Sequence, residues 1–490
     1  MRRKIVGALC AFIGTSALGV GAHTLEASMV NQPIVEVAQP TPAPNDCWRQ
    51  PAGFPPPAGA VIVTPQDDAV AALNSHGAGT VYWFAPGAHV ISGSLLVEDN
   101  DQLLGGPGAF LDGAFQGANA AIKGGGDNVT IAGLTIIHFG SWASAVNTDA
   151  AVVNRAVRDG WKILDSRFEE NDGVALFLGS HSLVSGSCFI GNGQSGLAVP
   201  KRGKSDFANP IVDVTVQDSA FINNGAEFGT GLNCGGCSAG MKFWAATTVT
   251  VRNNVVRGNH LQGIWFDNNN ADVLIENNQV VDNDGSGIMY ESSYNATIRN
   301  NTFSGNAVQN GQQHTFPIAA LFISTSGGHS GVPGSPEISV TGNSFSNDYN
   351  ALTVFEDPNR FCGSVTDTSV GACTRTGGTI QGCQALAMQH VSYAEFARSC
   401  RWSVQNIKIE SNSFGAPSPA CVSEWCGRVS FISGEFSGDL KFRGGPSTRV
   451  DWGSSVIIES VLNGVSTAGN STSGLTLSRG YALDHVTGTF

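Results

Sequence analysis

The stretch Asn277-Asn-Gln-Val280-Val-Asp-Asn283 is one of six copies of a seven-residue phrase that returns along this chain of 490 residues. Each copy opens with a small, mostly polar residue, has an apolar residue three places later and closes with Asn. The closing residues are spaced by 21, 32, 35, 24 and 23 positions, and they are Asn171, Asn192, Asn224, Asn259, Asn283 and Asn306. A period of 21 to 24 residues, lengthened twice by insertions, predicts a solenoid whose units stack along one axis.

Short stretches of alternating apolar and polar residues separate the copies, as in Val249-Thr-Val251 and Val273-Leu-Ile275. Alternation over three to five residues predicts short strands, and the Asn-Gly and Asn-Asp pairs between them predict tight turns. At about 3.3 Å per strand residue, a unit of roughly 22 residues accommodates three strands and three turns, which is one rung of a parallel β-helix. No stretch inside 160–350 has a sustained helical period.

Two structural roles follow for the phrase. We expect each closing Asn to lie at a turn in the left-handed backbone conformation and to stack its amide on the next rung as a ladder. We expect the apolar fourth residue of each copy to line one wall of the core, and these residues are Phe168, Phe189, Phe221, Val256, Val280 and Phe303.

Over about 60–415 the repeat resembles the right-handed parallel β-helix superfamily, which includes pectate lyases, polygalacturonases and related carbohydrate-active proteins. The resemblance implies an all-β, right-handed parallel β-helix. Asn147-Thr-Asp149 matches the first short motif of the polygalacturonase group, but the Asp-Asp, Gly-His-Gly and Arg-x-Lys motifs of that group do not follow. Val174-Ala-Leu-Phe177 stands where the acid pair would be needed, so the polygalacturonase site is not carried over.

The organisation along the chain begins with a secretory signal peptide over 1–22, since Arg2-Arg-Lys4 precedes the apolar run Ile5–Ala22; an uncleaved membrane anchor is the alternative. Residues 23–57 are rich in Pro and predict a mobile linker. The β-helix is expected over 58–426, with a short helix that starts at Thr64 as N-cap and covers its open end, and with a first coil that starts at Val81. We expect an inserted Cys-rich loop over about 357–403 and further strands with a terminal cap over 427–490.

The cysteines indicate an oxidising compartment, so we expect a secreted or cell-surface protein. Eleven Cys are present, and removal of the signal peptide with Cys10 leaves an even number. The close pairs favour loop disulfides, with redox or zinc chemistry as the alternative for the Cys-Gly-Gly-Cys pair, and they are Cys234/Cys237, Cys362/Cys373, Cys383/Cys400 and Cys421/Cys426. This leaves Cys47 with Cys188.

Charge is sparse: 13% of residues are charged and the net charge is −13. No basic face is evident apart from Lys201-Arg-Gly-Lys204, so nucleic acid is not an expected partner. No segment after the signal peptide is long and apolar enough to span a membrane. We expect a monomer.

Chemistry is expected on the outside of the strands that follow each closing Asn. Three of these strands read Gly240-Met-Lys-Phe-Trp244, Gly263-Ile-Trp-Phe-Asp267 and Gly287-Ile-Met-Tyr-Glu291. Because side chains alternate along a strand, the second and fourth places point into the core and the third and fifth point outward. The two outward columns are Lys242, Trp265 and Met289 in one, and Trp244, Asp267 and Glu291 in the other.

The candidate catalytic residues are Asp267, Glu291 and Lys242, and we expect them in a solvent-facing groove. The candidate sugar-binding residues are Trp244, Trp265, Phe355, Asn268 and Lys201. Two carboxylates on neighbouring rungs suit a glycoside hydrolase. The leading hypothesis is therefore a glycoside hydrolase that acts on a cell-wall or extracellular polysaccharide. The alternatives are a polysaccharide lyase, in which Asp267 and Glu291 bind Ca²⁺ and Lys242 removes a proton, and a non-catalytic adhesin or glycan-binding protein.

Overall fold

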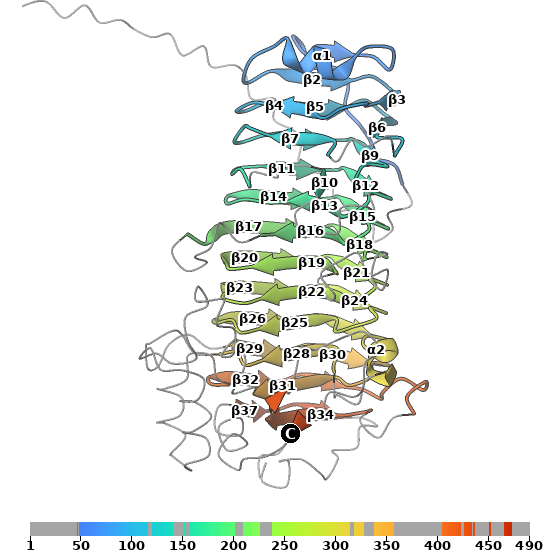
Figure 1. Ribbon diagram of the computed structural model, residues 1–490. Helices are drawn as coiled ribbons and strands as arrows, with labels where there is room; N and C mark the ends of the chain where they lie inside the picture. Colours follow the sequence, from blue (N-terminus) through green and yellow to red (C-terminus); the bar gives the residue numbers. More distant parts are fainter. Residues whose placement is uncertain are drawn as a thin grey trace, which may run out of the picture. The chain divides into compact units, whose positions relative to one another are not determined.

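The computed structural model describes residues 47, 49–115, 120–140, 150–152, 154, 157–200, 209–225, 238–313, 318–327, 338–356, 404–422, 426–433, 435–436, 450–451 and 465–472. The described part is a stack of rungs that contribute one strand each to three long parallel sheets (Figure 1). This arrangement confirms the all-β parallel β-helix.

Sheet A contains, in spatial order, β1 (Val61–Val63), β2 (Val81–Phe84), β5 (Gln102–Gly105), β8 (Thr130–Ala132), β11 (Lys162–Leu164), β14 (Ser182–Ser185), β17 (Ile211–Gln217), β20 (Ala246–Arg252), β23 (Ala271–Glu276), β26 (Ala296–Arg299), β29 (Ile338–Thr341), β32 (Ile407–Glu410) and β37 (Val465–Ala468). Sheet B contains β3 (Gly87–Val90), β6 (Ala109–Asp112), β9 (Thr135–Ile137), β12 (Arg167–Glu169), β15 (Cys188–Ile190), β18 (Ala220–Ile222), β21 (Val255–Arg257), β24 (Gln279–Val281), β27 (Thr302–Ser304), β30 (Ser344–Ser346), β33 (Ser413–Phe414) and β38 (Ser471–Thr472).

Sheet C contains β10 (Ala150–Val152), β13 (Val174–Phe177), β16 (Ser195–Val199), β19 (Ala239–Trp244), β22 (Gln262–Asp267), β25 (Ile288–Glu291), β28 (Leu321–Ser324), β31 (Leu352–Glu356) and β34 (Val429–Ser433). Two small sheets pair β4 (Leu95–Val97) with β7 (Ile122–Gly124), and β35 (Glu435–Phe436) with β36 (Val450–Asp451). The described ranges contain the helices α1 (Ala69–Asn74) and α2 (Val308–Gln313), and α2 was not expected from the sequence. Strands β34 and β37 continue sheets C and A beyond residue 427.

The core lies between the three sheets and is lined as the phrase predicts. All six apolar fourth residues are fully buried, and Phe168, Phe189 and Phe221 stack in register with ring centroids 4.7 and 4.6 Å apart. The parallel register brings identical places of successive copies into contact. The repeat in the sequence therefore becomes a continuous apolar column, in which three stacked Phe rings are followed by Val256 and Val280.

The closing Asn residues form the expected ladder, but their backbone is not left-handed. The amide nitrogen of Asn224 donates to Oδ1 of Asn259 at 3.0 Å, and Asn259 donates to Asn283 at 2.8 Å. None of the six has a positive φ; this conformation belongs to the first and sixth places of the phrase, such as Asn277 (φ 57°) and Asp282 (φ 53°). The closing Asn is therefore selected for its buried amide, and turn formation falls to its neighbours.

A second ladder runs through the second place of the phrase, where the sequence analysis assigned no role. Asn254 donates to Asn278 at 3.0 Å, and Asn278 donates to Asn301 at 2.9 Å. The ladder then continues through Asn343 and Asn412. Two rows of buried amides thus hold successive rungs in one register.

The N-terminal segment departs from the prediction of a mobile linker up to residue 57. A disulfide joins Cys47 to Cys188 in β15, and Arg167 donates to the carbonyl oxygen of Cys47. Further along, the backbone nitrogens of Ala52 and Phe54 donate to Asp165 and to the carbonyl oxygen of Gly105, at 3.1 and 2.7 Å. The described part of this segment is therefore bound to the rungs by its own backbone groups.

The first helix and the first coil also differ in detail from the prediction. Asp68, not Thr64, caps α1, because its carboxylate accepts hydrogen bonds from Val70 and Ala71. Thr64 instead donates to Asp67 in a turn before the helix. Strand β1 pairs with β2, so the stack starts one strand before Val81.

Candidate functional site

The candidate residues on sheet C lie in the predicted columns. In the strand register, Lys242 pairs with Trp265 and Trp244 with Asp267; on the next rung Asp267 pairs with Glu291. The alternate residues Phe243 and Phe266 are fully buried and point into the core. The structure therefore brings Lys242, Trp244, Trp265, Asp267 and Glu291 together on the outward face.

Each carboxyl group of this cluster has a partner within it. Lys242 Nζ lies 3.0 Å from Asp267 Oδ2, across one rung. The same ammonium lies 3.8 Å from the ring centroid of Trp265 and 5.6 Å from that of Trp244. The indole nitrogen of Trp265 donates to Glu291 Oε2 at 3.0 Å. The arrangement alternates cation, aromatic ring and carboxylate over three rungs.

We expected all five residues in a solvent-facing groove, but three of them are largely or fully buried. The side chains of Lys242 and Asp267 are only 12% and 11% exposed, and Glu291 is fully buried. Trp244 and Trp265 are partly exposed. Outward placement is decided by strand alternation, whereas exposure depends on what else packs on the sheet.

The neighbouring rungs continue this outward face as an apolar surface. Met289, Phe322, Phe355 and Ile432 form an apolar cluster on the outward face, and Trp265 packs against it. Phe355, an expected sugar-binding residue, is only 1% exposed, so its ring does not present a surface to solvent. Within the cluster, Trp244 and Trp265 are partly exposed, whereas Lys242 and Asp267 keep only 12% and 11% of their side-chain surface exposed.

Asn268 follows Asp267 in the left-handed conformation, with a φ of 49°. Its backbone nitrogen donates to the carbonyl oxygen of Glu291 at 3.1 Å, which fixes the turn at the end of β22.

For the Ca²⁺ hypothesis, no group of three or more His, Cys, Asp or Glu side chains within the described ranges could hold a metal ion. The two carboxylates proposed as Ca²⁺ ligands have protein partners instead: Asp267 pairs with Lys242, and Glu291 accepts a hydrogen bond from Trp265.

Several expected residues fall outside the described residues. These are Lys201, Asn147, Asp149, Cys234, Cys237, Cys362, Cys373, Cys383 and Cys400. Of the expected cysteine pairs, Cys47–Cys188 and Cys421–Cys426 are present as disulfides.

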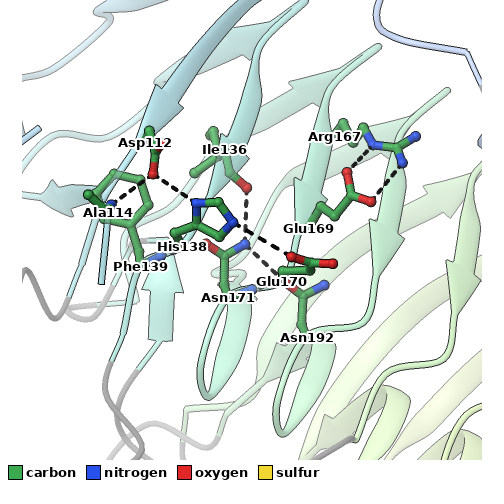
Figure 2. A network of polar contacts seen from close by, with 10 residues as sticks. All are labelled: Asp112, Ala114, Ile136, His138, Phe139, Arg167, Glu169, Glu170, Asn171 and Asn192. Atoms are coloured by element: carbon green, nitrogen blue, oxygen red, sulfur yellow. Dashed lines mark hydrogen bonds and ion pairs between the residues drawn. The ribbon is translucent and has the colours of Figure 1, made fainter. Parts of the chain in front are cut away.

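A second polar cluster escaped the sequence analysis, and Figure 2 shows it at the ends of strands in sheet B. The imidazole of His138 lies between two carboxylates: its Nδ1 is 2.9 Å from Asp112 Oδ1, and its Nε2 is 3.6 Å from Glu170 Oε2. Glu169 turns away from this cluster and pairs with Arg167 at 2.7 Å. The available signal was Glu170 at the sixth place of its phrase, where later copies have Gly, Asn or Asp.

Three long parallel sheets wound rung upon rung define the fold class of this chain, which is a right-handed parallel β-helix. The family model described as "Periplasmic copper-binding protein (NosD)" matches residues 180–369. No curated protein matches the chain by sequence. Among the helices of the described ranges, none has the length and apolarity needed to cross a membrane.

Three solved structures are similar to this chain at low identity. The catalytic unit of a thermostable GH87 α-1,3-glucanase from Streptomyces thermodiastaticus has a TM-score of 0.53 and 15% identity, covering 87% of this chain and 71% of that chain. The A-module of the mannuronan C-5 epimerase AlgE6 from Azotobacter vinelandii has a TM-score of 0.43 and 14% identity, covering 84% and 93%. The surface protein and adhesin PfbA of Streptococcus pneumoniae has a TM-score of 0.46 and 12% identity, covering 86% and 99%.

Proposed function

We propose that this chain is an extracytoplasmic β-helix protein that acts on a polysaccharide through the outward face of sheet C. The observation that carries the proposal is the partly exposed pair Trp244 and Trp265 with the Lys242 ammonium against both rings. Flat aromatic faces suit the apolar C–H face of a sugar ring, and the ammonium adds hydrogen-bond donors for its hydroxyl groups. The two disulfides and the periplasmic family model support the location outside the cytoplasm.

Glycoside hydrolysis is the reaction we propose first, because Asp267 and Glu291 are direct partners on neighbouring strands. Neighbouring strands lie about 4.8 Å apart, which is close to the carboxyl separation of roughly 5 Å in retaining glycosidases. Asp267 is the less buried of the two, with 11% of its side chain exposed, and we assign it the acid–base role. The buried Glu291 holds Trp265 in place and would need to be uncovered to act as nucleophile.

The two alternatives have different support. A lyase needs Lys242 as a neutral base, but Lys242 is the cationic partner of the Asp267 carboxylate, which disfavours that role. A non-catalytic glycan-binding protein is favoured by the complete burial of Glu291, since a carboxyl group without access to the sugar cannot react with it. Binding is thus common to the hydrolase and to the non-catalytic alternative, and turnover separates them.

The test is a panel of polysaccharides incubated with the purified protein, with reducing ends, unsaturated uronates and binding measured in parallel. New reducing ends that disappear in Asp267→Asn support hydrolysis, and unsaturated uronates support the lyase. Trp265→Ala and Lys242→Ala should weaken binding of the same polysaccharide. Arg299→Ala, which removes an exposed cation paired with Glu276 on sheet A, is the matched control. Unchanged binding in both sheet C variants would contradict the proposed site.

A further inference from the structure

The corner that follows the strands of sheet B carries a feature outside the site proposed above. At this corner the first residue after each strand from β9 to β30 has a positive φ, a conformation that Gly, Asn and Asp adopt at little cost. Six of the rungs from β15 to β30 obey this rule, with Gly191, Asn223, Gly258, Asp282, Gly305 and Asn347. Two earlier rungs place His138 (φ 60°) and Glu170 (φ 50°) there instead.

At the neighbouring rung the residues with a positive φ lie two and three places after the strand. Ala114 and Phe115 follow β6 with φ of 49° and 51°, and an aromatic residue rarely adopts this conformation. The Phe115 side chain is nevertheless exposed, at 54%, and its ring centroid lies 4.7 Å from that of His138. Strained residues that meet at one exposed corner suggest that their side chains have a role there.

The hydrogen bonds decide what this corner can bind. Asp112 Oδ1 accepts from the backbone nitrogen of Ala114 at 2.7 Å and lies 2.9 Å from His138 Nδ1. A neutral imidazole that donates through Nδ1 has an acceptor at Nε2. The carboxylate of Glu170 is a second acceptor, 3.6 Å from that nitrogen and too distant for a direct hydrogen bond.

Two acceptors that face each other are bridged by a group with several donors. A protonated primary amine has three donors and a positive charge. The carboxylates of Asp112 and Glu170 give the corner a negative electrostatic potential, which attracts such a cation. The exposed Phe115 ring adds a cation–π surface beside them. A sugar ring presents an apolar face next to its amine, whereas the ammonium of a lysine side chain lies at the end of four methylenes.

We propose that this corner, made by Asp112, Phe115, His138 and Glu170, is a binding site for a sugar that carries a protonated amine. The amine donates to His138 Nε2 and Glu170 Oε2, and the sugar ring packs on Phe115. Asp112 is a positioning residue, because it holds the imidazole so that Nε2 faces Glu170. The site is independent of Lys242 and its neighbours on sheet C.

The experiment is titration of the intact protein with glucosamine oligosaccharides at pH 7, followed by calorimetry and by the NMR signals of the imidazole. The N-acetylated oligosaccharides of the same length lack the charge, and a lysine tripeptide has the ammonium without the sugar. We expect binding only of the amino sugars. Glu170→Gln should weaken it about tenfold, and loss of the exposed cation–π contact in Phe115→Ala should weaken it roughly two- to fivefold.

Two further variants guard against misleading results. His138→Asn removes the imidazole but tolerates the left-handed backbone, so it should fold and lose binding. Asp213→Asn removes a carboxylate from another exposed imidazole pair, Asp213 with His181 at 3.0 Å, and should leave binding unchanged. The proposal is overturned by absent binding, by equal binding of the N-acetylated sugars or the lysine peptide, or by an equal loss in Asp213→Asn.

Discussion

The indole nitrogen of Trp265 donates a hydrogen bond to Oε2 of Glu291, which lies 3.0 Å away on the next rung of sheet C. Glu291 is fully buried, while Trp265 is partly exposed. A buried carboxyl group thus orients the aromatic surface that we assign to the polysaccharide. Variants that keep or remove this hydrogen bond can distinguish a positioning role of Glu291 from a catalytic role.

Glu291→Gln keeps an oxygen that can accept from the Trp265 indole, so binding of the polysaccharide should change by less than about twofold. Glu291→Ala removes the acceptor and leaves a buried donor, which should cost about 1–3 kcal/mol of unfolding free energy and weaken binding. Calorimetric binding and urea denaturation measure the two effects. Equal losses of binding in both variants would contradict the positioning role.

Lys242→Met should destabilise the protein by about 1–3 kcal/mol, because it leaves the largely buried Asp267 carboxylate without its ion-pair partner. Arg299→Met breaks the pair with Glu276, in which the Arg299 side chain is 46% exposed, and should cost at most about 1 kcal/mol. Chemical denaturation of both variants gives the comparison. A larger loss in Arg299→Met would argue against the importance of the buried pair.

Asp348 continues the ladder after Asn306, where the earlier members are Asn. Its Oδ1 accepts from the side-chain and backbone nitrogens of Asn306 at 3.0 and 2.8 Å, while its buried Oδ2 has no hydrogen-bond partner among the described residues. Burial raises the pKa of Asp348 to about 8 from an ordinary value of 3.8. The folded state therefore favours the protonated acid.

The sign of the pH dependence follows from this raised pKa. The contribution of Asp348 to stability is fully present below about pH 4 and is lost as the pH rises through about 8. Asp348→Asn should remove this dependence and stabilise the protein at pH 8 by a few kcal/mol, roughly. Thermal unfolding of both proteins from pH 4 to 9 tests it, and parallel curves for the two would refute the assignment.

The ladder itself should contribute strongly to stability. Asn259 donates to Asn283 and to the carbonyl oxygen of Phe221, and accepts from Asn224. Asn259→Ala leaves these buried groups unsatisfied and should cost roughly 2–4 kcal/mol, more than one lost bond. Thr302→Ala on the exposed face of β27 should change the free energy of unfolding by less than about 0.5 kcal/mol, as usual for surface sites. Similar effects of the two would contradict the ladder's role.

The disulfide between Cys47 and Cys188 should keep the N-terminal segment on the rungs. The double variant Cys47→Ser with Cys188→Ser should lose about 2–5 kcal/mol of stability, as is typical for a long closed loop. Amide exchange at Ala52 and Phe54 should become faster, since their hydrogen bonds then form without the covalent link. Unchanged exchange would show that the backbone bonds suffice.

Much of the fold could be predicted because each rung repeats the same local pattern. The inward places of the phrase were correct from Phe168 to Phe303, and so was the Asn ladder. The second ladder and the cap of α1 by Asp68 were missed, since a polar residue at a turn has several possible partners and only geometry selects one. The described part of the segment before residue 58 was mistaken for a mobile linker because its bonds are made by backbone groups, which leave no mark in the sequence.

The sequence by itself determined the parallel rungs, the core columns and which side chains point outward, because strand alternation and a fixed period follow from local patterns. Only the tertiary structure decided that Asp267 pairs with Lys242, that Glu291 is buried against Trp265 and that His138 lies between Asp112 and Glu170. Exposure and side-chain pairing depend on contacts between rungs that lie far apart in the sequence. Such contacts are set by packing and by the competition of polar groups for partners, and a repeat does not encode them.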